Sequence, residues 1–165
     1  MRLWPYQMFS VLPYRQMLAQ WRECLAVSGM LAKDLENKSG INHYIIDRVK
    51  NYSIEHFVVY CDLVRKEFER RNWTIGTNTI EKLNNDINFE NVLSKIEINE
   101  HDNNVITPSI SIKYDNIEEI LFYGFHDDRY IKQCLYKFQE MYDCDALTSD
   151  VWKELQSKFS RLIEY

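Results

Sequence analysis

Residues 53–71 have the sequence SIEHFVVYCDLVRKEFERR, which forms the best amphipathic pattern in the chain. Ser53 suits a helix cap, and apolar residues then recur every three or four positions, from Ile54 through Val58 to Phe68. That period places the apolar side chains on one face of a helix, while Arg and Lys mix with Glu on the other face. The segment therefore predicts a long surface helix with one side against a core.

The same period predicts more helices on both sides of this segment. A short helix is expected at residues 79–88, and longer ones are expected near residues 13–27, 128–142 and 149–163. Pro108 restricts any strand in the alternating stretch 105–112 to a sheet edge. We expect an all-α protein: a single compact helical domain of three to five main helices, with at most a short extended segment near 105–112.

The expected core combines apolar side chains from these helices. On the first helix, a stripe about 100° wide that runs from Tyr14 through Leu18 to Leu25 is expected to face inward. The residues predicted to be buried are Trp21, Leu25, Val58, Val64, Phe68, Leu135, Phe138 and Trp152.

The composition fits one ordinary globular domain. With 165 residues and 45% hydrophobic content, the chain can build a single core, and only four Gly and three Pro favour helices over many short strands. No apolar run approaches the 18 residues of a membrane span, and the residues after Met1 lack the apolar stretch of a signal peptide. We therefore expect a cytoplasmic protein without membrane contact.

The four cysteines, Cys24, Cys61, Cys134 and Cys144, show no C-x-x-C spacing and no matching histidines. A zinc site is therefore not expected, and we predict neither a metal nor a cofactor. Cys24 and Cys61 fall inside expected helices, where reduced packing residues are the expected role.

The net charge of −5 is divided unevenly along the chain. Residues 1–75 carry 11 Lys and Arg against 8 Asp and Glu, whereas residues 76–165 carry 9 against 17. Because clustered basic residues are attracted to DNA phosphates, the first part can face nucleic acid, and the acidic second part is expected to face away or to limit the footprint.

The first 23 residues hold the candidate chemistry. The chain opens Met1-Arg2-Leu3-Trp4, and the expected first helix carries Met17-Leu18-Ala19-Gln20-Trp21-Arg22-Glu23. Away from the apolar stripe, this helix places Arg15, Arg22 and Glu23 on one arc with two alanines. From the pattern alone, a solvated helix face is the commoner meaning of such charges, and a DNA-facing surface is the alternative.

The Met-Arg-Leu-Trp opening and the Arg22-Glu23 pair resemble the phage and viral pyrimidine-dimer DNA glycosylases of the endonuclease V type and the bacterial proteins grouped with them. The resemblance covers about residues 1–75 and leaves 76–165 as a divergent acidic half of the same domain. A second matching stretch is Tyr60 to Trp73, where Cys61 stands at a family histidine and Asn72 at a family glycine. Asn tolerates the left-handed conformation that a helix end uses.

The resemblance implies the roles of the site residues. Methionine removal needs a small second residue and Arg2 is large, so the nucleophile would be the amino group of Met1. Glu23 would be the catalytic carboxylate, and Arg2, Arg15 and Arg22 would hold DNA phosphates. A family arginine three positions after the glutamate is replaced here by alanine at position 26.

Two functions follow as hypotheses. The first is a DNA-repair glycosylase with AP-lyase activity on damaged double-stranded DNA of the pyrimidine-dimer type, acting through a Schiff base on the N-terminal amine. The second is a catalytically idle descendant that binds protein or nucleic acid, which the acidic second half, Cys61 and Ala26 favour.

Overall fold

The structure is a computed structural model that describes residues 2–35, 44–52, 54–99, 104–106, 111–113 and 126–163. These residues form two short 3-10 turns, Tyr6–Met8 and Ser160–Leu162, and seven α-helices: α1 (Tyr14–Leu35), α2 (Tyr44–Lys50), α3 (Ile54–Arg70), α4 (Thr77–Ile87), α5 (Phe89–Ser94), α7 (Asp128–Asp143) and α8 (Ser149–Lys158). The expected helical fold is confirmed, but the number of helices exceeds the predicted three to five.

All five expected helices are present, but two have other ends than predicted. Helix α8 ends at Lys158 instead of near residue 163, and the 3-10 turn Ser160–Leu162 follows it. Helix α1 ends at Leu35 instead of near residue 27, because Val27, Ser28 and Leu31 continue its buried face. Helices α2 and α5 were not predicted. Each is shorter than two helical turns, which is too short for an amphipathic pattern to be recognised. The helix cap expected at Ser53 lies outside the described residues.

A small antiparallel sheet extends beyond the expected extended segment. Its three strands, β1 (Glu97–Asn99), β2 (Asn104–Ile106) and β3 (Ser111–Lys113), pair in the order β1-β2-β3. Ile98 pairs with Val105, which pairs in turn with Ile112. The prediction of at most a short extended segment near 105–112 therefore underestimated the strand content. The fold nevertheless remains mainly helical.

The buried face of α1 is rotated relative to the predicted stripe. Tyr14 is 43% exposed and Leu25 is only partly buried, whereas Gln20 and Ser28 are fully buried. Ser28 can be buried because its hydroxyl donates to Leu25 O and Asp86 Oδ2. The other residues predicted for the core are buried as expected: Trp21, Val58, Val64, Phe68, Leu135, Phe138 and Trp152.

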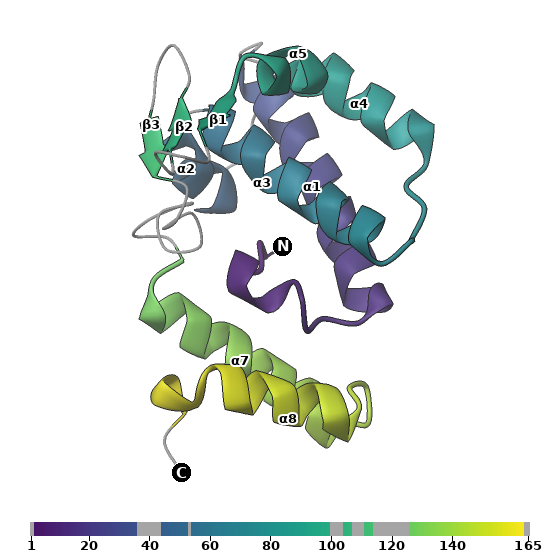
Figure 1. The fold of residues 1–165 in the computed structure, drawn as a ribbon, viewed down its shortest axis with the longest axis vertical. Helices are drawn as coiled ribbons and strands as arrows, with labels where there is room; N and C mark the ends of the chain where they lie inside the picture. The colour runs from purple at the N-terminus through teal and green to yellow at the C-terminus, as the bar shows by residue number, and fades with distance from the viewer. Residues whose placement is uncertain are drawn as a thin grey trace.

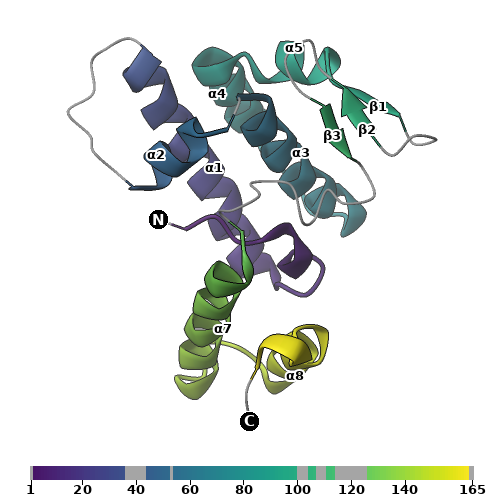
Figure 2. The same ribbon diagram turned by 90° about the vertical axis from the view of Figure 1, so that its left-hand side faces the viewer.

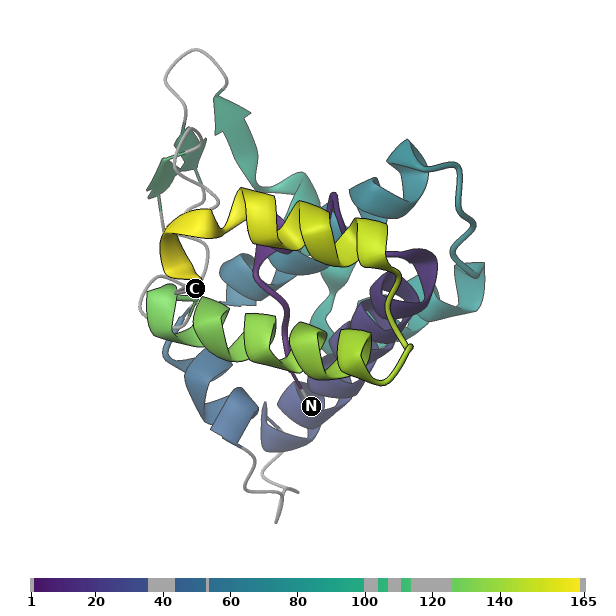
Figure 3. The ribbon, with the colours of Figure 1, turned by 90° about the horizontal axis from the view of Figure 1, so that it is seen from below.

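The helices form two groups with the start of the chain between them. Helices α1 and α3 pack on each other, and α4 and α5 lie against them. Helices α7 and α8 run side by side as a separate hairpin (Figure 3). The first residues of the chain lie between this hairpin and the α1–α3 group in both side views (Figures 1 and 2). This position buries the start of the chain among helices from both halves of the sequence.

Asn72, just beyond the end of α3, adopts the backbone conformation that was expected for it. Its φ is 55°, the left-handed conformation expected where relatives have glycine. The neighbouring Arg71 donates to the carbonyl oxygens of Phe9 and Leu12 at 2.5 and 2.6 Å, and its guanidinium lies 4.6 Å from the ring centroid of Trp73. Arg71 therefore joins the end of α3 to the loop that leads into α1.

Candidate active site

The backbone of residues 3 and 4 is fixed by four side chains, three from helices α1, α3 and α7 and one from the bend before α7. Trp4 N donates to Gln20 Oε1 on α1 at 2.9 Å, and Trp4 O accepts from Tyr60 Oη on α3 at 2.7 Å. Leu3 O bonds to Nε2 of His126 at 3.0 Å and accepts from Oη of Tyr130 on α7, also at 3.0 Å. We call Gln20, Tyr60, His126 and Tyr130 the N-terminal clamp.

The N-terminal clamp supplies hydrogen bonds to backbone groups of Leu3 and Trp4, as a neighbouring strand would in a sheet. Leu3 has no exposed area, and an unpaired backbone group in such a position is costly. Three of the four clamp residues belong to no feature that the sequence singles out as chemical. Tyr60 is part of the second stretch that resembles the family, and His126 and Tyr130 lie outside both matching stretches.

Arg2 lies against α7. Its Nη1 donates to Gln133 O at 3.3 Å, and the guanidinium carbon lies 5.8 Å from the ring centroid of Trp4. The side chain is half-buried, and it also contacts Cys134. Arg2 therefore helps to hold the start of the chain on α7, and its predicted contact with DNA stays a prediction.

Glu23 follows Gln20 by three residues on α1, so the two side chains are neighbours on one side of the helix. The Glu23 side chain is half-buried, and its Oε2 has no solvent contact. The turn that carries Glu23 thus adjoins the turn that holds Trp4. Met1, the predicted source of the amine, lies outside the described residues.

Arg15 and Arg22 lie on the open side of α1. Both are exposed, and the two exposed residues between and beyond them, Ala19 and Ala26, are small. The four positions follow each other at three- and four-residue spacing and form one accessible stripe. The structure therefore brings Arg22 next to Glu23 and places Arg15 two turns earlier on the same face.

Burial keeps the imidazole and the two phenols of the N-terminal clamp uncharged. Loss of solvation lowers the pKa of His126 to about 3 and raises the pKa of Tyr60 and of Tyr130 well above the ordinary value. Burial also raises the pKa of the Cys61 thiol, which contacts Cys24, and raises the pKa of Cys134 to about 12. All three cysteines are buried and unbridged, as packing residues would be.

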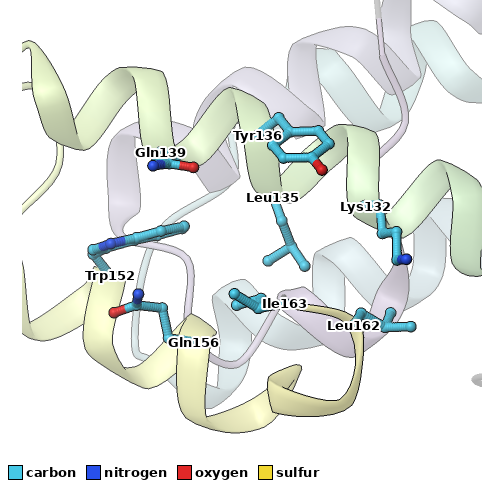
Figure 4. A pocket seen from close by; sticks show the side chains of 8 residues that line it. All are labelled: Lys132, Leu135, Tyr136, Gln139, Trp152, Gln156, Leu162 and Ile163. Atoms are coloured by element: carbon cyan, nitrogen blue, oxygen red, sulfur yellow. The ribbon is translucent and has the colours of Figure 1, made fainter. Parts of the chain in front are cut away.

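Two cavities among the described residues lie outside this region. Figure 4 shows a cavity of about 190 Å³ between α7 and α8, where Trp152 and Gln156 face Leu135 and Gln139. A larger one of about 590 Å³ lies among the ends of α1, α2 and α4. Within the described ranges, no cluster of three or more His, Cys, Asp or Glu could hold a metal ion. None of the helices described is both long and apolar enough to cross a membrane.

Residues 1–81 match the family model described as pyrimidine dimer DNA glycosylase. This match confirms the resemblance first seen in the opening residues and in the Arg22-Glu23 pair. The matched region is just under half of the chain, and it is similar to the pyrimidine dimer DNA glycosylases. It contains α1, α3 and two clamp residues, Gln20 and Tyr60, but not His126 or Tyr130. The chain matches no curated protein and no solved structure.

Proposed function

We propose that the chain is a DNA-repair glycosylase with AP-lyase activity on double-stranded DNA that carries pyrimidine-dimer-like damage. The observation that carries the proposal is the placement of the start of the chain in the family-matched region. Residues 3 and 4 are hydrogen-bonded on several sides, beside the turn of α1 that bears Glu23. A binding module would need no such fixation of its first residues.

The proposed nucleophile is the α-amino group of Met1. A free terminus has a pKa near 7.7–8.0, so roughly a tenth or more of it is neutral at pH 7, against well under about a thousandth of an ordinary lysine. Met1 is bonded to Arg2, whose side chain is held on α7 by Gln133 O. The amine is therefore tethered to a fixed part of the molecule, which reduces the entropy lost on reaching the sugar.

The reaction needs an amine, a carboxylate and no other cofactor. The Met1 nitrogen forms a bond to the sugar C1′ while the bond from C1′ to the base breaks, and the base leaves with the electron pair and takes a proton. A proton then moves from the nitrogen to the ring oxygen as the bond from C1′ to that oxygen breaks, and the nitrogen lone pair forms the C=N bond of the Schiff base. Removal of a proton from C2′ then expels the 3′ phosphate and cleaves the strand.

Glu23 is the proposed carboxylate of this sequence. Positive charge builds up on the sugar as the base leaves, and a negative group in a partly desolvated position stabilises that charge. Its half-buried position on α1 supports this role. The same carboxylate can accept the proton taken from C2′.

The proposed DNA contacts are Arg15 and Arg22 on the open stripe of α1, with Arg2 beside the amine. Arg15 and Arg22 are exposed, as phosphate contacts must be, and Ala19 leaves room for close approach of the backbone. The damaged nucleotide or its partner base must leave the stack before C1′ can be reached.

A duplex with one thymine dimer at a defined position tests this function. The wild-type chain is expected to release the base and cut the strand at the dimer and to leave a matched undamaged duplex intact. Glu23→Gln is expected to bind the damaged duplex with little activity. Binding of DNA without any incision by the wild-type chain would instead support the binding-module hypothesis.

A further inference from the structure

We propose that His126 and Tyr130 are positioning residues for the N-terminal amine, so that the region outside the family match completes the site. The inference rests on the proposed function of Met1 and adds a role for α7. Both side chains bond to Leu3 O, which lies two residues from Met1. Neither residue falls within residues 1–81.

The contacts of α7 and α1 fix one peptide plane from both edges. Leu3 O and Trp4 N belong to the same planar peptide group. Its oxygen is bonded by His126 and Tyr130, and its N–H is bonded by Gln20 on the opposite helix group. This peptide plane is held at both edges, which fixes the Leu3 Cα from which the chain continues toward Arg2.

The beginning of α7 is built so that the two groups converge. Asp127 Oδ1 accepts from Tyr130 N at 2.8 Å and caps the helix, which fixes the turn between His126 and Tyr130. The two rings stack, with centroids 5.3 Å apart and planes 24° from parallel. Both side chains are about 95% buried, so their hydrogen bonds to Leu3 O do not compete with solvent.

The same helix holds the next residue toward the amine. Arg2 Nη1 donates to Gln133 O, less than one turn beyond Tyr130. Helix α7 therefore constrains the chain at Leu3 through its backbone and at Arg2 through its side chain. A single hydrogen bond would satisfy the buried Leu3 O, whereas two side chains bond to it and a third contact holds Arg2.

The test compares Tyr130→Phe, His126→Gln and His126→Leu with the wild-type chain. Tyr136→Phe is the matched control, because Tyr136 lies on the same helix and is 67% exposed. The measurement is the single-turnover rate of borohydride-trapped adduct on saturating abasic-site DNA, with the dissociation constant and the melting temperature measured alongside. Each trapping rate is measured well below the melting temperature of that variant and is divided by the concentration of folded protein.

We expect Tyr130→Phe and His126→Leu to slow trapping roughly tenfold to a hundredfold, because a displaced amine loses its alignment with the sugar. DNA affinity is expected to stay within about twofold. His126→Gln keeps an N–H donor and is expected to recover much of the rate, which a mere packing role would not predict. Tyr136→Phe is expected to match the wild-type chain.

A DNA-independent measurement separates this inference from the proposed function. The pH dependence of labelling of the N-terminal amine by a small acylating reagent gives the pKa of that amine. If Glu23 acts on this amine as proposed, the amine should titrate above the ordinary 7.7–8.0, and Tyr130→Phe should return its pKa toward that range. If the wild-type chain traps no DNA but this shift is seen, the function fails and the positioning stands. Equal trapping rates and equal labelling profiles in all variants would overturn the positioning role.

Discussion

Tyr60 on α3 donates its hydroxyl hydrogen to the carbonyl oxygen of Trp4 at 2.7 Å, and the phenol has no exposed area. This contact spans 56 positions of sequence within the family-matched region. It joins the segment next to the proposed nucleophile to the helix with the strongest amphipathic pattern. The packing of α3 and the placement of the start of the chain are therefore one structural feature.

Tyr60→Phe is expected to destabilise the protein by about 1–3 kcal/mol, because Trp4 O loses its donor in a position that water does not reach. Urea unfolding followed by circular dichroism measures the change. Tyr142→Phe serves as the control, since that ring is 37% exposed and its loss of a hydroxyl should cost little. An equal effect of both substitutions would contradict the role of the hydroxyl.

His126 is expected to make stability depend on pH. Burial lowers its pKa to about 3 in the folded state, whereas the unfolded chain has an ordinary pKa near 6.5. Between these values the unfolded state binds the extra proton, so this contribution is complete above about pH 6.5 and is lost as the pH falls toward 3. The limiting slope is about 1.4 kcal/mol per pH unit.

The matched variants for this prediction are His126→Gln and His56→Gln. His126→Gln is expected to flatten the stability profile between about pH 4 and 6.5. The pKa of His56 is also lowered by desolvation, but its side chain is less deeply buried, so His56→Gln should flatten the profile less. A profile that His126→Gln leaves unchanged would show that His126 does not stay neutral in the folded protein.

Arg71 and Arg70 are adjacent but are expected to differ strongly in their effect on stability. Arg71 is only 17% exposed and bonds to the carbonyl oxygens of Phe9 and Leu12, whereas Arg70 is 59% exposed and pairs with Glu67 near the surface. Arg71→Ala is expected to cost about 2–4 kcal/mol in the free energy of unfolding, and Arg70→Ala much less. Thermal unfolding of the two variants measures the difference, which must vanish if the loop contacts contribute nothing.

Arg22→Ala is expected to weaken binding to damaged and undamaged duplexes alike and to reduce the salt dependence of binding by about one phosphate contact. Fluorescence anisotropy between 50 and 200 mM salt measures both effects. Lys137→Ala is the control: Lys137 is exposed on α7 and pairs with Glu140. Equal salt slopes for the wild-type chain and Arg22→Ala would remove Arg22 from the DNA contacts.

Much of the helical fold could be predicted because long amphipathic patterns are local. The boundaries of α3 and α7 follow directly from where their apolar positions begin and end. The inward face of α1 could not be predicted from hydrophobicity, because it includes Gln20 and Ser28, whose partners lie in other parts of the chain. The burial of Tyr14 was also predicted wrongly, because Phe68 and Trp73 cover only part of its ring.

The candidate site likewise contains residues that could be predicted from the sequence and residues that could not. Arg22 and Glu23 could be found from a short motif, because the motif lies in one helix. The N-terminal clamp could not, since His126 and Tyr130 lie more than 120 positions from Leu3 and only the fold brings them to its carbonyl oxygen. No pattern of spacing in the sequence links residues that far apart.

The most direct test of the central claim is to locate the covalent bond. The wild-type chain with a free N-terminus is incubated with abasic-site DNA and borohydride, and the adduct is digested and mapped by mass spectrometry. We expect the DNA on the N-terminal peptide, and we expect an uncleavable N-terminal extension to abolish both the adduct and strand cleavage. Glu23→Gln should still form the adduct with abasic-site DNA while losing strand cleavage, and it should not break the base–sugar bond in DNA that carries a dimer. A folded wild-type chain that forms no adduct, or one whose adduct maps to a lysine side chain, would contradict the account.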